Sequence, residues 1–412
     1  MKPDWTDPAE IRGRLRFVGW AGLAFSLVAW VGSFWPFDDV IDRMGTPLGA
    51  DFRCFYIAGR MVLDGRTDEL YDPRVAYDEL HKLFPDGDRR ESLPYRYPPF
   101  VAAVVAPLAL LSYGVAWGIF TALSLTMLVV AVRLLAAQLS TLRDDATWRA
   151  TFWIALFGWP VVWEVVLGGQ WSLFTLAIVA GTTRLLSLQR PVAAGGVLAL
   201  AAFKPTVLLY FAAGLLLRYP QMFLGAVPVG LALSGASWLV VGTDGLQEYA
   251  ALGSKLAGGS WDVPIDAQKF QDLLPLVSQI VPGFGRTLLM ACGVVSVVVV
   301  VWMHRRGRND ALLYSALLAI NVSAGTYIPI YDLVLLVPAV LFGIAGVQQC
   351  GKPVSARDLI LMQVVVAWAY FGPHLSQGMY PTLGLQVFPI VWLIVVVATM
   401  TTIFRHQTRP EA

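Results

Sequence analysis

Asp51 is the residue whose type and surroundings best suit chemistry in this chain. It begins the run of residues 51–60, just beyond the first hydrophobic segment, and aromatic and cationic side chains flank it. A positioned carboxylate at a membrane surface can act as a general base. The structural alternative is a helix cap, or an ion pair with Arg53 or Arg60. Asp51 is therefore the leading candidate for a catalytic group.

The composition places Asp51 in a membrane protein. Of 412 residues, 57% are hydrophobic and only 14% are charged, which is far more apolar than a typical soluble domain. The first apolar run, 17–35, is too long for a signal-peptide core and has no small-residue cleavage site, so we expect a retained transmembrane helix. The sequence predicts an all-α integral membrane protein with one polytopic domain, 1–412.

Apolar runs of bilayer length predict about twelve transmembrane helices. The expected spans are 17–35, 113–138, 150–167, 171–187, 192–203, 205–218, 222–241, 285–303, 310–326, 331–347, 357–372 and 384–404. The run 98–111 is also apolar, but it is short and contains Pro107. It would make the following span longer than one bilayer crossing, so we expect a re-entrant or interfacial helix there.

The short basic loops orient this topology. Arg305, Arg306 and Arg308 lie in one loop, and the segments 352–357 and 405–412 are also basic, so all three are expected in the cytoplasm. The polar stretches 36–97, expected to be helical, and 242–284 then form two extracytoplasmic loops. Most of the polar residues that look functional fall on this same face. The simpler alternative is that external loops are where polar residues accumulate.

Several site classes have no support in the sequence. The four histidines are scattered, and neither a Cys-x-x-Cys nor a His-Glu-x-x-His motif occurs, so no metal site is expected. The topology puts Cys54 outside, Cys292 in the membrane and Cys350 inside, which excludes a structural disulfide. No soluble segment is long enough for a nucleotide-binding domain. An activated substrate should therefore come from the membrane or the outer compartment.

A set of short motifs resembles glycosyltransferase family 87, the polyprenol-phosphate-mannose-dependent mannosyltransferases and their relatives. The motifs, in chain order, are Asp51-Phe52-x-x-Phe55-Tyr56-x-Ala58, Leu63-x-Gly65, Leu70-Tyr71-Asp72, Tyr97-Pro98-Pro99-Phe100, Pro107-Leu108, Gly169-Gln170, Phe203-Lys204-Pro205 and Tyr331-Asp332-Leu333. Each fragment is short, but their order and spacing extend over most of the chain. The resemblance implies the GT-C membrane fold and a lipid-linked sugar donor used on the external face.

Such an enzyme needs a base and a cation. The acceptor hydroxyl must lose a proton as it attacks the anomeric carbon, and Asp51 is the expected base. Asp38 and Asp39 form a second acidic candidate, but they fit a membrane boundary better. Lys204 interrupts an apolar run directly before a proline, so two half-helices could meet there and present the cation to the donor phosphate. Its side chain could instead snorkel to the interface. Arg286 is a weaker second phosphate-binding candidate.

The remaining polar candidates are expected to bind substrate. They are Tyr56, Gln170, Trp261, Asp262, Asp332 and His374. Gln170 follows two glycines and could bind a sugar hydroxyl, and Trp261 could cover a sugar ring. Three of them also have a structural alternative. Asp332 could cap a helix, His374 could lie in a solvated loop, and Trp261 could anchor the chain at the membrane interface.

Glu164 lies inside an apolar span, where an unpaired carboxylate is costly, so we expect a buried structural partner of an arginine or lysine. The alternative is a catalytic role.

These expectations combine into one function. The chain is expected to transfer a sugar from a lipid-linked donor to a glycolipid or glycan acceptor. The resemblance implies that the donor is polyprenyl-phosphate mannose or a related pentose or hexose donor, and that the anomeric carbon is inverted. The donor is a substrate, and no cofactor is expected because lysine and arginine can neutralise a monophosphate leaving group. The expected location is the plasma membrane, with the site outside. The alternative class is a transporter or flippase of lipid-linked sugars, which would also place charged residues at broken helices.

Overall fold

The computed structural model describes residues 6–34, 48–87, 92–258, 270–350 and 355–394. Helices make up nearly all of these residues, and the only β-type pairing among them is an isolated bridge between Phe270 and Pro329. The α-helices are α1 Pro8–Phe34, α2 Phe52–Leu63, α3 Pro73–Leu83, α4 Pro99–Ala109, α5 Tyr113–Ala136, α6 Ser140–Asp144, α7 Ala146–Gly158, α8 Pro160–Gly168, α9 Ser172–Ser187, α10 Pro191–Ala199, α11 Leu209–Arg218, α12 Phe223–Gly258, α13 Leu274–Ile280, α14 Gly285–Gly307, α15 Asp310–Ala324, α16 Leu336–Gln349 and α17 Ala356–Leu383.

Short 3₁₀ helices lie between the α-helices. They are η1 Thr67–Glu69, η2 Leu200–Phe203, η3 Pro205–Leu208, η4 Pro220–Met222 and η6 Ile330–Leu335. Polar residues set several helix starts. Asp72 accepts a hydrogen bond from the Arg74 N–H at 2.8 Å, and Pro73 occupies the first position of α3. Asn309 caps α15 in the same way, through the Leu312 N–H at 3.0 Å.

The all-α membrane architecture is confirmed, but the count of about twelve spans is not. Among the described residues, six helices are long and apolar enough to cross a membrane, and a seventh crossing forms if α7 and α8, bent by 56°, act as one span. The other apolar helices, α4, α9, α10 with η2, η3 with α11, and α15, are shorter. A crossing needs about 20 helical residues, so the length of these short helices does not confirm them as spans.

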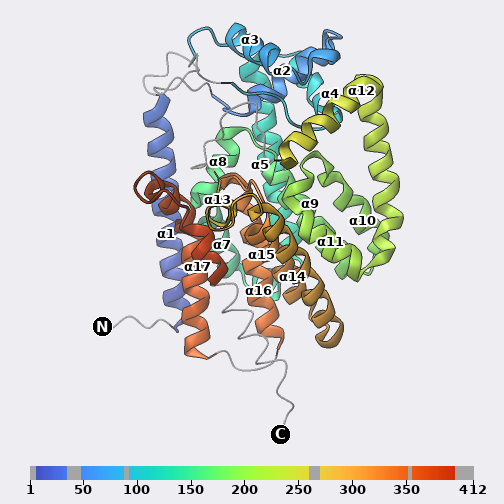
Figure 1. Ribbon diagram of the computed structural model, residues 1–412. Coiled ribbons are helices and arrows are strands. Elements are labelled where there is room, and N and C mark those ends of the chain that lie inside the picture. The colour runs from blue at the N-terminus through green and yellow to red at the C-terminus, as the bar shows by residue number, and fades with distance from the viewer. Residues whose placement is uncertain (1–5, 35–47, 88–91, 259–269, 351–354, 395–412) are drawn as a thin grey trace.

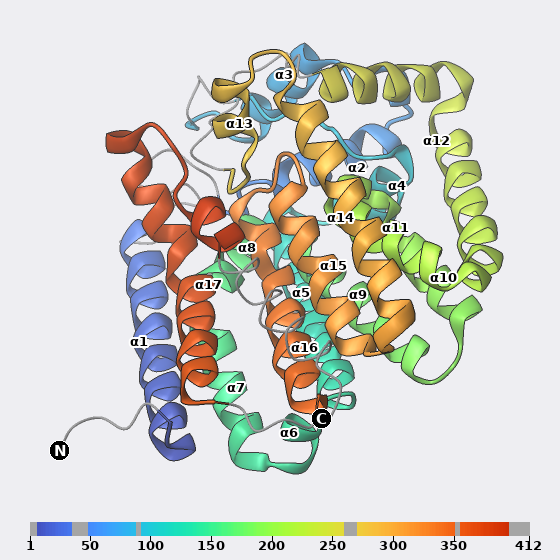
Figure 2. The ribbon, with the colours of Figure 1, turned by 60° about the horizontal axis from the view of Figure 1, so that its bottom comes forward.

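A helical cap covers one end of the bundle. Helices α2, α3 and α4 lie there, so the described part of the stretch 36–97 is helical, as the sequence predicted (Figure 1). Helix α4 ends before α5 begins and packs against α2 and α12, so the run 98–111 is a separate short helix. Helix α12 kinks at Gly242, which has φ 67°, and its second half turns across the cap (Figure 2). The predicted loop 242–284 therefore begins as a helix.

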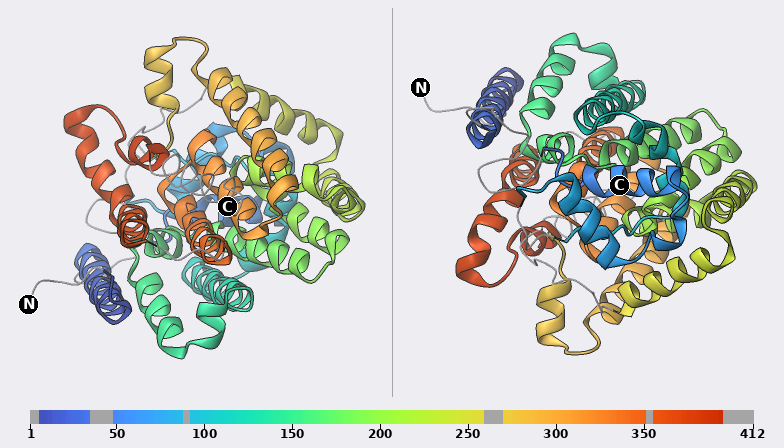
Figure 3. Two further views of the ribbon diagram at one scale, coloured as in Figure 1. Left: turned by 90° about the horizontal axis from the view of Figure 1, so that it is seen from below. Right: turned by 90° about the horizontal axis from the view of Figure 1, so that it is seen from above.

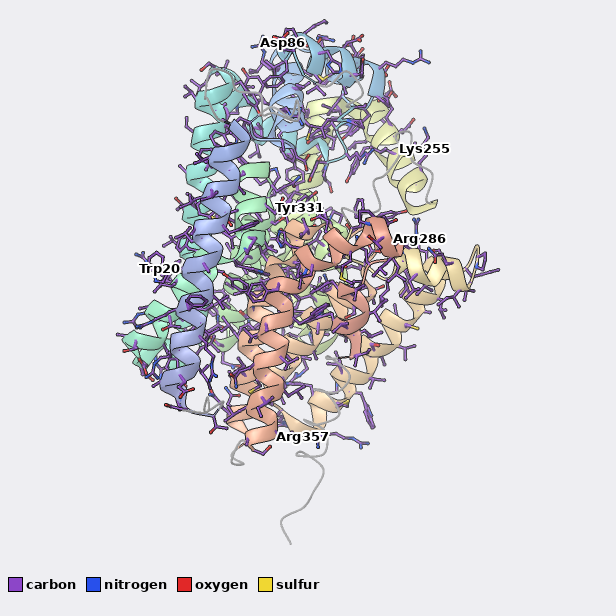
Figure 4. The ribbon with its side chains drawn as sticks, turned by 90° about the vertical axis from the view of Figure 1, so that its left-hand side faces the viewer. Trp20, Asp86, Lys255, Arg286, Tyr331 and Arg357 are labelled. Atoms are coloured by element: carbon purple, nitrogen blue, oxygen red, sulfur yellow. The ribbon has the colours of Figure 1, made fainter. Side chains whose placement is uncertain are left out.

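The opposite end of the bundle carries the segments that the charge pattern assigned to the cytoplasm. The start of α1, the short α6 and the start of α17 lie at this end (Figure 2). Figure 4 places Arg357 there and Asp86 at the cap. Seen along the bundle, α1 and α17 lie beside α7, and α10 to α12 lie on the other side (Figure 3). The two ends thus differ in structure, because helices α2 to α4 form a cap at one end only.

Candidate active site

Asp51 lies where the cap meets the bundle. It occupies the N-cap position of α2, but its side chain caps none of the N–H groups of that helix. Its backbone N–H donates to the Gly168 carbonyl at 3.0 Å, which ties the start of α2 to the end of α8. Its Oδ2 accepts a short hydrogen bond from Nε2 of Gln170. The carboxylate is therefore held by a side chain from the turn between α8 and α9 and is not used as a cap.

The turn between α8 and α9 positions Gln170. Gly169 ends α8 in the left-handed region, with φ 64°. A Cβ atom there would lie 2.4 Å from Phe52 Cβ and 3.0 Å from the Gly49 oxygen, so only glycine lets this turn approach the start of α2. The Gln170 N–H then donates to the Val165 carbonyl at 3.0 Å. This geometry directs the glutamine toward Asp51.

The Gln170 side chain is 2% exposed and has a partner at each end of its amide. Nε2 donates to Asp51, and Oε1 accepts from the Tyr97 hydroxyl at 3.3 Å. Binding of a sugar hydroxyl by this amide stays a prediction. The structure shows it joined to the candidate base.

Lys204 lies at the predicted break between two half-helices. The 3₁₀ helix η2 ends just before Lys204, and η3 begins just after it. The buried Asn321 amide supports the break, because Oδ1 accepts from the Tyr210 N–H at 3.0 Å and Nδ2 donates to the Val207 carbonyl. Backbone groups released by the break are thus satisfied within the protein, as a chain in a membrane requires.

The Lys204 ammonium is held by Asp332. Its Nζ lies 2.5 Å from Asp332 Oδ2 and 4.6 Å from the centre of the Tyr331 ring. The side chain of Lys204 is 16% exposed and that of Asp332 is 1% exposed. Asp332 Oδ1 also accepts a hydrogen bond from the Ser172 hydroxyl at 2.6 Å. Asp332 therefore orients the lysine.

The same turn joins both acidic groups. Gln170 contacts Asp51, and Ser172, two residues later, contacts Asp332. Burial raises the pKa of Tyr97 well above its usual value, and the charges of Asp51 and Asp332 raise it further. Tyr97 thus lies near both carboxylates. We call Asp51, Tyr97, Gln170, Ser172, Lys204 and Asp332 the polar cluster.

Two of the predicted site residues lie outside the polar cluster. The Tyr56 hydroxyl donates to the Leu111 carbonyl at 2.8 Å, and its ring packs edge-on against Tyr113 in the core. Arg286 donates to the Tyr327 hydroxyl, and its guanidinium lies 5.0 Å from the centre of that ring. Figure 4 shows Arg286 toward the edge of the molecule, with Tyr331 nearer its middle.

His374 also lies away from the polar cluster, and it corrects one expectation. Its Nε2 is 3.7 Å from Glu164 Oε1, and the Glu164 side chain is 48% exposed. The sequence predicted a buried Glu164 paired with arginine or lysine. That was wrong, because α17 brings a histidine to this exposed face of α8. Trp261, Asp262, Asp38 and Asp39 lie outside the described residues.

A second polar contact, which the sequence analysis did not anticipate, lies beside the cluster. Asp272 is 2% exposed and accepts hydrogen bonds from the N–H groups of Leu274 at 3.0 Å and Ile328 at 2.9 Å. Burial raises the pKa of this carboxyl to about 6. The contact ties Asp272, within the stretch 242–284, to the segment just before η6, which carries Asp332.

Sequence reasoning also missed the parts played by Ser172 and Asn321. Ser172 gave a weak signal as a hydroxyl two residues after Gln170, and Asn321 gave one as an amide in an apolar helix. The three cysteines are free thiols, and the described residues contain no group of three or more side chains able to hold a metal ion.

Comparison with known proteins identifies the family. Residues 95–338, more than half of the chain, match the sequence model of glycosyltransferase family 87. The chain belongs to glycosyltransferase family 87. The family 87 match includes five of the six members of the polar cluster, and Asp51 precedes its first residue. No solved structure matches the chain.

Two curated relatives of this family 87 chain come from Mycolicibacterium smegmatis. One is a polyprenol-phosphate-mannose-dependent alpha-(1-2)-phosphatidylinositol pentamannoside mannosyltransferase, which is 28% identical over 87% of this chain and 85% of its own length. The other is a polyprenol-phosphate-mannose-dependent alpha-(1-2)-phosphatidylinositol mannoside mannosyltransferase. It is 29% identical over 32% of this chain, and the match spans 28% of its own length.

Proposed function

We propose that this family 87 membrane glycosyltransferase moves mannose from a polyprenyl-phosphate donor to a glycolipid or glycan acceptor, with Asp51 as general base. The observation that carries the proposal is the polar cluster, in which one turn joins a carboxylate that caps no helix to a lysine held at a helix break. Both relatives are polyprenol-phosphate-mannose-dependent mannosyltransferases, which supports the choice of donor.

Proton transfer is the role proposed for Asp51. The acceptor oxygen forms a bond to the anomeric carbon as the bond from that carbon to the phosphate oxygen breaks. The acceptor proton passes to Asp51, and the phosphate leaves with the bonding electron pair. Attack opposite the leaving group inverts the anomeric carbon. Gln170 donates to the carboxylate and so favours its ionised form, which is the form that a base requires.

Charge neutralisation is the role proposed for Lys204. A lysine ammonium has three N–H donors, and the contact with Asp332 accounts for one of them. The others can bind the donor phosphate, whose negative charge grows as the lipid phosphate leaves. Arg286 is a weaker candidate for the same phosphate, because its guanidinium already contacts Tyr327.

Acceptor and sugar contacts are proposed for the remaining predicted residues. Trp261 and Asp262 belong to the stretch 242–284, which Asp272 ties to the segment just before η6. Tyr56, Gln170, Asp332 and His374 stay proposed substrate contacts, although their partners in the structure are protein groups. We propose that Asp332 and Gln170 act mainly by orienting Lys204 and Asp51.

The proposed location is the plasma membrane, with the site on the extracytoplasmic face. Arg357, in a segment that the charge pattern assigns to the cytoplasm, lies at the end of the bundle opposite the cap (Figure 4). The polar cluster lies where the cap meets the bundle. A donor anchored in the outer leaflet would thus meet it from the membrane.

A reconstitution assay tests the reaction class. Purified protein in vesicles receives polyprenyl-phosphate mannose with a panel of glycolipid acceptors, and the expected result is a mannosylated acceptor together with released polyprenyl phosphate. A parallel assay follows movement of the donor across protein-containing vesicles without acceptor. Donor movement with no product from any acceptor would contradict the proposal and favour a flippase. Product formed only from a different sugar donor would correct the sugar.

A further inference from the structure

The Gln170 amide can face Asp51 in two ways, and only one of them helps a base. Its nitrogen end donates to a carboxylate, whereas its oxygen end would place a second acceptor against the same negative charge. In the structure the nitrogen end faces Asp51. The negative charge of Asp51 itself disfavours the other orientation, and a donor at the oxygen end of the amide would add to this preference.

The Tyr97 hydroxyl is placed to add to that preference. It lies 3.3 Å from Gln170 Oε1 and donates to it. Burial, with the nearby Cys54, Asp51 and Asp332, raises the pKa of Tyr97 well above its usual value, so the hydroxyl keeps the proton that it donates. A neutral hydroxyl opposite Oε1 leaves the amide nitrogen directed at Asp51.

Contacts on several sides hold Tyr97 itself. Its carbonyl accepts a hydrogen bond from the Tyr71 hydroxyl at 2.9 Å. Its ring lies edge-on to Phe55, with centroids 4.7 Å apart. Pro98 and Pro99 follow and restrict the backbone before α4. The hydroxyl therefore has a fixed position from which to orient the amide.

We propose that Tyr97 is a positioning residue, whose hydroxyl holds the Gln170 amide with its N–H toward Asp51 and so keeps this carboxylate ready to accept a proton. The proposal rests on the proposed role of Asp51 as base. Tyr97 acts through Gln170 and needs no contact with substrate.

Asp51 has other titratable and charged neighbours besides the members of the hydrogen-bond chain. The charge of Asp51 contributes to the pKa shifts of Cys54, Tyr97, Tyr113 and Tyr331. The charges of Arg53, Arg96 and Asp332 act on members of the same group. The variants that test the proposal change no formal charge among them. An altered pH dependence then reports the hydrogen-bond chain.

The test is the pH dependence of kcat/KM for sugar transfer by the full-length protein. In Tyr97→Phe the acid limb should move up by about one pH unit, because a donor to the ionised carboxylate is no longer held in place. Activity at high pH should stay within about three-fold of wild type. Gln170→Leu should shift the limb at least as far. The double variant should match Gln170→Leu alone, since Tyr97 acts only through that amide.

Tyr95→Phe is the matched control. Tyr95 is a buried neighbour whose hydroxyl donates to the Pro98 carbonyl at 2.9 Å and lies outside the hydrogen-bond chain, so its loss should leave the acid limb in place. Equal loss of rate at every pH in Tyr97→Phe, or additive shifts in the double variant, would overturn the proposal. Asp51→Asn separates the role of Asp51 from that of Tyr97. If Asp51→Asn retains turnover, Asp51 is not the base. If Asp51→Asn is inactive but the acid limb of Tyr97→Phe does not shift, only the role proposed for Tyr97 is removed.

Discussion

Lys204 combines a buried partner with partial access to the outside of the protein. Its side chain is 16% exposed, and it lies against Asp332 and over the Tyr331 ring. A lysine so placed carries a fixed charge and loses little freedom when it meets an anion. Removing it, however, would leave Asp332 as a buried carboxylate with no lysine beside it, which is itself destabilising. A test of this residue must therefore separate donor binding from folding.

Lys204→Ala should raise the KM for the lipid-phosphate donor by about ten-fold or more, because a charge-assisted hydrogen bond is lost, with little change in the KM for the acceptor. Steady-state kinetics with each substrate varied in turn will show it. Lys82→Ala is the control, since this exposed lysine pairs with Glu79 in the cap. The double variant Lys204→Met with Asp332→Asn removes the unpaired carboxylate. Wild-type donor kinetics in that double variant would leave Lys204 with only a structural role.

The residue types explain what could be predicted at this scale. Asp51, Gln170, Lys204 and Asp332 stood out because charged and amide groups are rare in so apolar a chain, and the structure brings all four into the polar cluster. The hydroxyls of Tyr97 and Ser172 did not stand out, because serine and tyrosine are common at helix ends. Which end of an amide faces a carboxylate depends on a third group, and no sequence spacing reveals that.

The turn between α8 and α9 is the element that joins the two halves of the site. It places Gln170 against Asp51 and Ser172 against Asp332 within three residues. The backbone of Asp51 is tied to the same turn through the Gly168 carbonyl. A small change in the path of this turn would move both contacts together.

Gly169→Ala should cost about 1–3 kcal/mol of unfolding free energy, because the added Cβ meets Phe52 and the backbone is in the left-handed region. We expect a lower Tm in detergent and strongly reduced transfer. Gly168→Ala is the matched neighbour, since a Cβ there would meet only the Gln170 side chain, at 3.9 Å. Equal tolerance of the two substitutions would mean that the close approach of the turn to α2 does not matter.

Broken and short helices also show where prediction from the sequence ended. The break at Lys204 was predicted from a lysine and a proline in an apolar run. The second half of α12 was predicted as a loop, because its residues are more polar than those of a span, yet they form a helix that covers the bundle (Figure 2). Helices such as α9 and α15 are apolar because their neighbours bury them, and apolarity alone does not distinguish a buried short helix from a crossing.

At the scale of the whole molecule, the bundle and the cap have separate tasks. The bundle supplies Lys204, Asp332 and the turn with Gln170, and the cap supplies Asp51 and Tyr97. In the proposed mechanism, groups of the bundle hold the lipid-linked donor and the cap supplies the base. The family 87 match begins at residue 95, so it includes Tyr97 of the cap but not Asp51.

The most direct test of the account is sugar transfer by Asp51→Asn. Asparagine keeps the size of the side chain, and its oxygen can still accept from Gln170, but it cannot take up the acceptor proton. We predict that turnover falls by about 10²- to 10⁴-fold, whereas the Kd for the polyprenyl-phosphate donor and the Tm stay close to wild type. Transfer by the reconstituted variant at a rate near wild type would contradict the assignment of Asp51 as the base.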